Sequence, residues 1–425
     1  MSAKAIEVRI WGKSVGAVAA DPATGCYAFE YNPAWRRTGI ELAPLTMPLT
    51  ARQQVFVFPN LADSYMRLPA LLSDALPDAF GNALIDAWMA KHGVSRDSIT
   101  ALDRLAYMGR RGMGALEFRP TLGSQKESAK PIEMQRLVEA ARNVVHGDLA
   151  SDAHAQAALA NIIRVGTSAG GARAKAVVAW NPGTNELRSG QFDVEPGFAH
   201  WLLKFDGIGK DFELGTSGGY GRVEYGYHLM AKAAGIDMAP CRLLEENGRA
   251  HFMTQRFDRD GNAKLHHQSL CAMAHLDYRQ RGTHGYEQLF LAIGDLGLDP
   301  AAYEQAFRRM VFNVADRNCD DHSKNHGFLL RQGDGWSLAP AYDVTHAHNP
   351  KGEWTAQHLM SVNGKFDGIT RADLVAVADR FSVPNARRAI GEVAAAVGRW
   401  REFAQAAGLQ ADRTAEIESD FLPLA

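Results

Sequence analysis

Apolar residues recur at every second position near the start of the chain. They are Ile6, Val8 and Ile10 and, after a turn at Thr24-Gly25, Tyr27, Phe29 and Tyr31. A period of two is the pattern of a β-strand that buries one of its faces. The pattern therefore predicts that residues 5–31 form short β-strands.

A different spacing marks a long helix in the second half of the chain. Apolar side chains follow one another at steps of three and four residues: Tyr303, Ala306, Phe307, Met310, Val311 and Val314. That spacing places them on one face of an amphipathic helix. Asp299 and Pro300 precede the run as an N-cap residue and a first-turn proline. The sequence predicts a helix that begins near residue 300.

The same two periods assign the remaining elements. Helices are predicted over 79–92, 98–108, 131–147 and 222–234, with two more in 371–408 that divide near Ser382-Val383-Pro384. Strands are predicted over 115–118, 176–180, 200–205, 241–245 and 250–255. Residues 120–131 combine Gly, Ser, Pro and charges, and they are predicted to form a linker. Residues 260–283 are polar, and we interpret His266 and His267 as surface histidines.

The composition is that of a globular protein and excludes several classes of function. The 425 residues are 46% hydrophobic and 22% charged, and the length indicates two or three domains. A formal net charge of −2 gives no global basic field to attract nucleic acid or an anionic membrane. No run approaches ~18 apolar residues, so no membrane span is predicted.

The cysteines and the N-terminal residues bear on the cellular compartment. The cysteines are Cys26, Cys241, Cys271 and Cys319. Because they form no C-x-x-C pair, they argue against a disulfide framework and against a zinc site. The N-terminal residues contain no apolar signal core. We therefore expect a protein of the reducing cytoplasm.

One polar loop, directly after the amphipathic helix, carries the strongest chemical signal. It covers residues 317–325 and is followed by a short apolar run and then by Tyr342-Asp343. Asp320 and Asn325 have the spacing that kinases use for an Asp that orients the attacking hydroxyl and an Asn that binds Mg²⁺. Asp343 would then be the second metal ligand. The alternative is an ordinary surface loop, since a D-x-x-x-x-N match is common.

Further segments contain residues that could bind a nucleotide. Residues 165–175 combine glycines with small hydroxyl residues before a strand, as in a phosphate-binding loop or a flexible turn. Lys204 lies in an apolar strand, where it either snorkels to the surface or contacts phosphates. Glu224 either pairs with that lysine or simply favours a helix N-terminus. Residues 255–259 fall where a hinge between two lobes would bind adenine.

Together these motifs resemble the HipA family of toxin kinases, which are serine/threonine kinases of bacterial type II toxin–antitoxin systems. The resemblance is carried by Ser168-Ala169-Gly170-Gly171-Ala172-Arg173-Ala174-Lys175, the strand ending in Lys204, Glu224-Tyr225, Gln255-Arg256-Phe257-Asp258-Arg259, Asp320-Asp321-His322-Ser323-Lys324-Asn325 and Ala341-Tyr342-Asp343. It implies an α+β, protein-kinase-like bilobal fold with a small N-terminal β-rich domain and a mostly helical C-terminal lobe. The implied parts are an N-terminal domain (1–122), an N-lobe-like region with the phosphate loop (131–258) and a helical C-lobe with the catalytic loop (259–425).

The resemblance also implies a role for each matching position. Asp320 would be the catalytic residue, Asn325 and Asp343 would bind Mg²⁺, and Lys204, paired with Glu224, would contact the phosphates of ATP. The other positions implied at the nucleotide are Gly170, Gly171, Ala172, Lys175, Gln255, Phe257, His322 and Lys324.

Ser168 falls on the serine that the family autophosphorylates to silence the kinase, although the adjacent Thr167 leaves the position open by one residue. A phosphate adds about −1.5 to −2 charges, close to where the phosphates of ATP belong. Two positions depart from the family pattern. Gln255 stands where a glutamate is usual, and residues 172–175 differ from the best-known members. These departures bear on ATP affinity more than on reaction type.

The resemblance predicts partners as well. A protein substrate, such as an aminoacyl-tRNA synthetase or another translation component, would be phosphorylated on Ser or Thr and growth would arrest. A helix-turn-helix antitoxin of the HipB type would bind the chain and link it to DNA. Two other functions compete with this one. The chain could be a binding module that acts as a corepressor, or a metal-dependent hydrolase that uses Asp320, His322 and Asp343. No metal is expected at His346-Ala347-His348.

Overall fold

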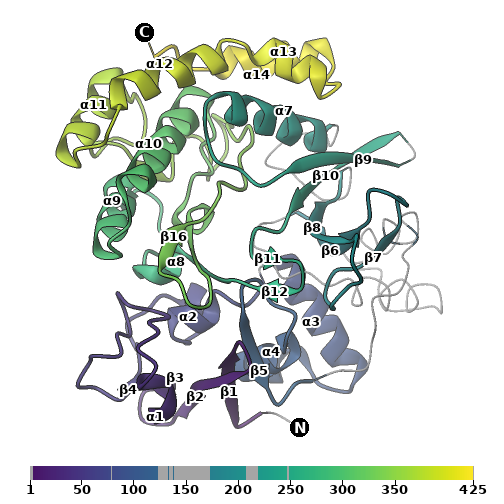
Figure 1. Cartoon of the computed structure of the whole chain (residues 1–425), viewed down its shortest axis with the longest axis vertical. Helices are drawn as coiled ribbons and strands as arrows, with labels where there is room; N and C mark the ends of the chain where they lie inside the picture. Colours follow the sequence, from purple (N-terminus) through teal and green to yellow (C-terminus); the bar gives the residue numbers. More distant parts are fainter. Residues whose placement is uncertain are drawn as a thin grey trace. The chain divides into compact units, whose positions relative to one another are not determined.

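The computed structural model describes residues 3–77, 79–122, 133, 137, 173–206, 219–246 and 248–424. The chain divides into two compact units (Figure 1). Unit 1 consists of Met1–Lys210, Gln255–Gln268 and Leu329–Gly335, and unit 2 consists of Asp211–Thr254, Ser269–Phe328 and Trp336–Ala425. Most of the predicted helix 131–147 and most of the predicted phosphate loop lie outside the described residues.

Among its described residues, unit 1 contains a five-stranded sheet. In spatial order its strands are β4 (Val55–Phe56), β3 (Cys26–Tyr31), β2 (Lys13–Asp21), β1 (Ala5–Ile10) and β5 (Leu116–Arg119). Neighbouring strands are antiparallel, with Ile6 opposite Val18 and Val8 opposite Phe118. Ile6, Val8 and Ile10 are fully buried, so the predicted alternation is confirmed.

Short helices accompany this sheet. They are α1 (Pro33–Arg36), α2 (Ala70–Ser73), α3 (Ala79–Lys91), α4 (Ala101–Met108) and the 3-10 helices η1 (Asp63–Tyr65) and η2 (Arg96–Ser98). α4 packs against β1 and β5. A capping box between Thr100 and Asp103 fixes its first residue. The helix predicted from residue 98 therefore begins at Ala101.

Two further groups of strands in unit 1 also pair in antiparallel fashion. β6 (Lys175–Trp180) pairs with both β7 (Leu187–Ser189) and β8 (Ala199–Lys204), and β11 (Arg259–Asp260) pairs with β12 (Ala263–Lys264). Every residue of β6 is buried. That burial explains why the sequence of β6 is an apolar run rather than an alternation. β13 (His266–Ser269) follows β12.

Unit 2 is mostly helical, and Figure 1 draws its C-terminal helices in green to yellow. Its helices are α7 (Tyr220–Ala233), α8 (Leu270–Met273), α9 (Tyr286–Asp295), α10 (Pro300–Ala315), η3 (Ser323–Asn325), α11 (Arg371–Arg380), α12 (Ala386–Val397), α13 (Trp400–Ala406) and α14 (Ala411–Asp420). Strands that lie wholly or partly in this unit, besides the end of β13, are β9 (Cys241–Glu246), β10 (Arg249–Gln255), β14 (His284–Gly285), β15 (Gly327–Leu330), β16 (Trp336–Leu338) and β17 (Met360–Ser361). α10 packs against α9 and α12.

His266 is buried and His267 is half-buried, so the interpretation of the pair as surface histidines is wrong for His266. His266, on β13, is 1% exposed, and burial lowers the pKa of its imidazole to about 3. His267 packs against Phe257, with ring centroids 5.5 Å apart, and burial lowers its pKa too. Tertiary packing decides burial here, and a polar segment with two adjacent histidines offers no periodic pattern that reveals it.

The segment 371–408 forms three described helices where two were predicted. α12 ends at Val397 with Gly398 as its C-cap, and α13 begins at Trp400. The indole of Trp400 is fully buried and meets the ring of Tyr227 edge-on, with centroids 5.2 Å apart. The break turns this tryptophan toward α7, a requirement that comes from packing and not from the local sequence.

Candidate functional site

The predicted catalytic loop begins where α10 ends. The side chain of Asp299 caps the helix by accepting a hydrogen bond from the N–H of Ala302 at 3.0 Å, and the predicted apolar stripe is buried along it. Arg317 then takes a positive φ of 59°, which ends the helical path. α10 therefore delivers the loop from a face packed into the core of unit 2.

A chain of buried polar side chains holds the loop in place. Asn318 Nδ2 donates to Asn313 Oδ1 at 3.0 Å, and Asn313 Nδ2 donates to the hydroxyl of Tyr286 at 2.9 Å. That hydroxyl donates to Asp321 Oδ2, also at 2.9 Å. Asp321 lies 2.9 Å from His358 Nδ1 through the same oxygen, and its Oδ1 accepts from the N–H of Leu359 at 2.8 Å. The network ties α9, α10 and the loop together.

Asp320 lies on the exposed side of this loop. Its side chain is 49% exposed, and its Oδ1 lies 3.8 Å from His322 Nε2. The ring of His322 meets that of Tyr278 edge-on at 5.3 Å, and Lys324 Nζ lies 5.1 Å from the centre of the same ring. A carboxylate so placed is accessible to a hydroxyl group of another molecule.

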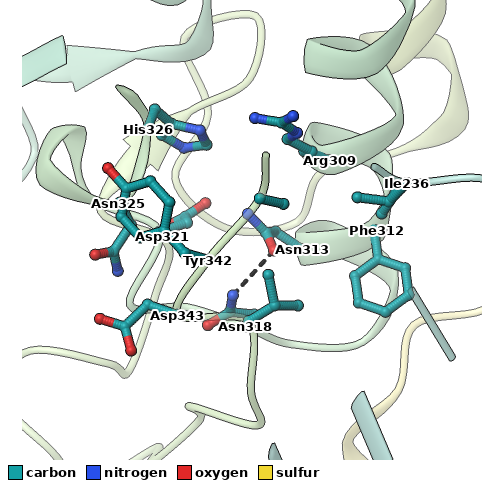
Figure 2. A pocket seen from close by; sticks show the side chains of 12 residues that line it. Ile236, Arg309, Phe312, Asn313, Asn318, Asp321, Asn325, His326, Tyr342 and Asp343 are labelled. Atoms are coloured by element: carbon teal, nitrogen blue, oxygen red, sulfur yellow. Dashed lines mark hydrogen bonds between the residues drawn. The ribbon is translucent and has the colours of Figure 1, made fainter. Parts of the chain in front are cut away.

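Asn325 and Asp343, the predicted metal ligands, line one pocket of unit 2 (Figure 2). Its lining residues are Ile236, Arg309, Phe312, Asn313, Asn318, Asp321, Asn325, His326, Ala341, Tyr342, Asp343 and Val344. Asn325 Nδ2 donates to the carbonyl of Asp320 at 2.7 Å, which leaves Oδ1 as the amide atom suited to a cation. Asp343 has a positive φ of 57°, a conformation that Asp tolerates better than most residues.

Backbone pairing brings Asp343 to the loop. The N–H of Ala341 donates to the carbonyl of Asp237 at 2.8 Å, and the N–H of Cys319 donates to the carbonyl of Ala347 at 3.0 Å. Residues 341–347 are thus anchored on both sides of Asp343. In addition, the hydroxyl of Tyr342 donates to the carbonyl of Lys324 at 2.8 Å. These bonds explain how residues 18 positions apart in the sequence reach one pocket.

The interior beneath the loop disfavours charge. Burial raises the pKa of Asp316 well above its usual value and that of the Tyr286 hydroxyl as well. Burial and the nearby Arg309 lower the pKa of His326 to about 4. Burial also lowers the pKa of Arg309 itself, to about 10. Burial thus favours the neutral forms of Asp316 and His326, whereas the side chain of Asp320 is half exposed.

The predicted phosphate-contacting lysines lie together in unit 1. Lys175 and Lys204 are directly opposite each other in the β6–β8 pair, so their side chains project from the same face. Both are buried, so Lys204 does not snorkel to the surface. The pairing of Lys204 with Glu224 joins residues of different units, and it stays a prediction.

The remaining predicted positions are placed as follows. In unit 1, Gln255 ends β10 and Phe257 follows, and the N–H of Arg256 donates to the carbonyl of His200 at 2.9 Å. Glu224 is a buried residue of α7. Outside the described residues lie Thr167, Ser168, Gly170, Gly171 and Ala172.

His346 and His348 share one acidic partner. Both contact Asp420 Oδ2 on α14, at 2.9 and 3.1 Å. Burial would raise the pKa of Asp420, but its bonds to the two imidazoles keep that pKa below its usual value. Among the described residues, no group of three His, Cys, Asp or Glu side chains is placed to hold a metal ion.

Family models match the chain in the order that the motifs predict. The HipA N-terminal domain matches residues 6–119. The HipA-like C-terminal domain matches residues 167–401, more than half of the 425 residues. The chain belongs to the HipA family. This family of toxin kinases is the one that the motifs resemble, and Asp320, Asn325 and Asp343 all lie within the C-terminal match.

Individual HipA-like relatives are distant. The putative kinase Y4mE of Sinorhizobium fredii (strain NBRC 101917 / NGR234) is 26% identical over 125 residues, which span 27% of this chain and 30% of that protein. A protein chain in the Shewanella oneidensis MR-1 complex of HipA, HipB and operator DNA aligns with a TM-score of 0.67 at 17% identity. That alignment covers 97% of this chain and 95% of the other. It confirms the mixed α+β, protein-kinase-like fold with a β-rich N-terminal domain.

The proinflammatory kinase CtkA of Helicobacter pylori aligns over 52% of this chain and 88% of its own. Its TM-score of 0.34, at 13% identity, is too low to support an inference. Within the described part of the chain, every helix is too short or too polar to cross a membrane.

Proposed function

We propose that this HipA-family chain is an ATP- and Mg²⁺-dependent serine/threonine protein kinase and the toxin of a type II toxin–antitoxin module. The observation that carries the proposal lies in unit 2. Asn325 and Asp343 line one pocket, and the loop that holds Asn325 presents Asp320 half exposed. Kinases use such a set, with two side chains for metal and one for the attacking hydroxyl.

The donor atoms of the pocket fit Mg²⁺. This ion binds oxygen ligands, and it is usually held by one or two carboxylates together with waters and substrate phosphates. Asp343 supplies a carboxylate and Asn325 supplies an amide oxygen. An ion held by these two side chains would supply positive charge that offsets the charge of the ATP phosphates. The family resemblance assigns contacts with the phosphates of ATP to Lys175 and Lys204 of unit 1.

In phosphoryl transfer the protein orients the attacking hydroxyl and the phosphates, and it stabilises the charge on the transferred group. The hydroxyl oxygen of a target Ser or Thr forms a bond to the γ-phosphorus of ATP. The bond from that phosphorus to the β–γ bridging oxygen breaks, and ADP leaves. The hydroxyl proton passes to the carboxylate of Asp320. The exposure of Asp320 is what allows a protein substrate to present its hydroxyl there.

The proposal extends to regulation and partners. Autophosphorylation at Ser168, or at Thr167, would silence the kinase, and the target would be a translation component such as an aminoacyl-tRNA synthetase. A HipB-like helix-turn-helix antitoxin would bind the chain and bring it to operator DNA. Family membership supports these points, and the Shewanella complex of HipA, HipB and operator DNA supports the antitoxin.

Transfer of labelled phosphate tests the proposal. The purified chain, incubated with γ-labelled ATP and Mg²⁺, should label itself at Ser168 or Thr167. Asp320→Asn and Asp343→Asn should each reduce labelling by at least about 10²-fold, because a general base or a metal ligand is lost. Asp334→Asn, an exposed change in unit 1, should label like the wild type. An unlabelled wild type, or full labelling of Asp320→Asn, would contradict the proposal.

Growth in cells separates this function from that of a corepressor module. A toxic kinase should arrest growth when expressed without its antitoxin, and Asp343→Ala should relieve the arrest. Arrest that survives Asp343→Ala, with antitoxin binding intact, would instead favour the binding module.

A further inference from the structure

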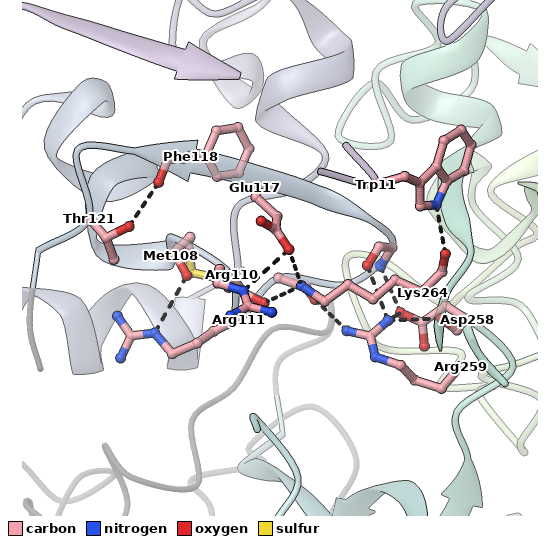
Figure 3. Close-up of polar contacts among 12 residues, drawn as sticks. Trp11, Met108, Arg110, Arg111, Glu117, Phe118, Thr121, Asp258, Arg259 and Lys264 are labelled. Carbon is pink, nitrogen blue, oxygen red and sulfur yellow. Dashed lines mark hydrogen bonds and ion pairs between the residues drawn. The ribbon is translucent and has the colours of Figure 1, made fainter. Parts of the chain in front are cut away.

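A loop of the N-terminal domain, residues 110–114, grips the segment that follows the proposed adenine hinge. All the residues involved belong to unit 1 (Figure 3). At the centre is the fully buried carboxylate of Asp258. It accepts hydrogen bonds from Arg256 Nε at 2.9 Å, from Arg259 Nη1 at 2.8 Å and from the N–H of Gly114 at 2.7 Å. One side chain thus joins two neighbouring arginines and a loop more than 140 residues earlier in the sequence.

The two arginines bond to the same loop. Arg256 Nη2 and Arg259 Nη2 each donate to the carbonyl of Gly112 at 3.3 Å, and Arg259 Nη1 donates to that of Gly114 at 3.1 Å. Burial would raise the pKa of Asp258, but the two guanidinium groups hold it well below its usual value. The carboxylate is therefore ionised, and each charge of the group has a partner.

A second set of contacts holds the hairpin of β11 and β12, which follows Asp258. Lys264 Nζ donates to the carbonyl of Arg110 at 2.8 Å and contacts Glu117 Oε1 at 3.0 Å. Trp11 Nε1 donates to the carbonyl of Lys264, also at 2.8 Å. Lys264 lies on β12, Glu117 on β5, Trp11 at the β1–β2 turn and Arg110 in the loop 110–114. Figure 3 shows these four residues. The N-terminal domain therefore holds the 256–264 segment at both of its ends.

Gly114 permits the close approach. Its φ of +73° favours glycine, and a Cβ at this position would lie 2.9 Å from the backbone nitrogen of His267. Any side chain at Gly114 would push the loop away from the segment 256–267. The loop 110–114 and the segment 256–267 are therefore complementary in shape as well as in charge.

We propose that the clamp formed by Asp258, Arg256, Arg259 and the loop 110–114 positions the adenine hinge. The inference rests on the proposed function, in which residues 255–257 bind adenine. The hinge directly precedes Asp258, and Arg256 is part of both. A backbone contact to a planar base needs its atoms fixed within about 0.5 Å. The N-terminal domain is thus a supporting part of the nucleotide site, and its clamp residues are positioning residues.

Nucleotides with and without a base test this role. Gly114→Ala and Asp258→Asn should raise the KM for ATP by about tenfold or more and leave kcat within about twofold, because binding common to ground and transition states is lost. Affinity for adenosine should fall in parallel. Inhibition by inorganic tripolyphosphate, which has no base, should stay at the wild-type level. A merely structural defect would not separate adenosine from tripolyphosphate.

A matched change elsewhere in unit 1 provides the control. Arg331→Gln breaks an exposed ion pair with Asp260 of β11, 2.9 Å long, that does not involve the loop 110–114, and it should leave the KM unchanged. If Asp258→Asn does not fold, the KM values of Gly114→Ala and of the milder Glu117→Gln test the clamp instead. Thermal unfolding checks that each variant is folded. Folded variants with the wild-type KM for ATP overturn the clamp alone. A wild type that binds no ATP overturns the proposed function and the clamp with it.

Discussion

Two adjacent aspartates on the predicted catalytic loop differ in their environment, which predicts that they differ in role. The side chain of Asp321 is fully buried and is hydrogen-bonded to Tyr286, His358 and the backbone. The side chain of Asp320 is half exposed. A buried carboxylate is tolerated only when hydrogen bonds replace its water. Asp321 therefore holds the loop in shape, while Asp320 is the one that another molecule can reach.

Replacing each aspartate by asparagine should separate these roles. In Asp321→Asn an NH2 group takes the place of an accepting oxygen, so at least one donor is left unpaired. The free energy of unfolding should fall by about 1–3 kcal/mol. For Asp320→Asn the change should stay within about 0.5 kcal/mol, as at other exposed sites, although phosphoryl transfer is lost. Urea unfolding at pH 7 measures both values, and equal midpoints for the two variants would refute the assignment.

At the scale of elements, the sequence predicts the helices and strands whose hydrophobic pattern lies within their own residues. The alternation in β1 and the stripe of α10 are enough to place both elements. The spacing of Asp320, Asn325 and Asp343 identified the candidate site, although their roles remain predictions, as do the three domain boundaries. Other features of the site depend on contacts between residues that are far apart in the sequence. The pairing of residues 317–319 with Ala347 and the hydroxyl of Tyr286 that meets Asp321 leave no local signal.

The contact between α7 and α13 gives a prediction at this scale. Gly226 of α7 is buried, and a Cβ there would lie 3.1 Å from the ring of Trp400. Gly391 of α12 is exposed, and a Cβ there would meet nothing within 4 Å. Both helices should gain up to about 1 kcal/mol from Gly→Ala through helix propensity. Gly391→Ala should realise the gain, whereas the crowding at Trp400 should cancel or reverse it in Gly226→Ala.

Thermal or urea unfolding of the two single variants provides the measurement. The wild type is the reference, and the sign of the difference between the variants is the result. A gain in Gly226→Ala as large as that in Gly391→Ala would show that α7 and α13 pack less tightly than described.

At the scale of the whole molecule, both units bury histidines in their neutral form. Among the described residues, burial lowers the pKa of His200, His228, His266, His267, His275, His284 and His326. The pKa falls to about 4 for His228 and His326 and to about 3 for His266. In the unfolded chain these groups take up protons near pH 6.5. Asp316 acts in the opposite sense, because its raised pKa lets the folded chain keep a proton that the unfolded chain releases.

Stability should therefore fall as the pH falls from about 6.5 toward 4. In that window the unfolded chain binds more protons than the folded chain, and each excess proton costs about 1.4 kcal/mol per pH unit. Several histidines outweigh the opposing protons of Asp316 and of Glu41, whose pKa burial also raises. Urea midpoints at pH 7.5, 6.5 and 5.5 measure the slope. His228→Phe, at a site where the imidazole stacks on Tyr225 with centroids 6.0 Å apart, should make the slope shallower, and the exposed His92→Gln should not. Midpoints that hold steady or rise toward pH 5.5 would mean that the buried imidazoles are charged in the folded protein.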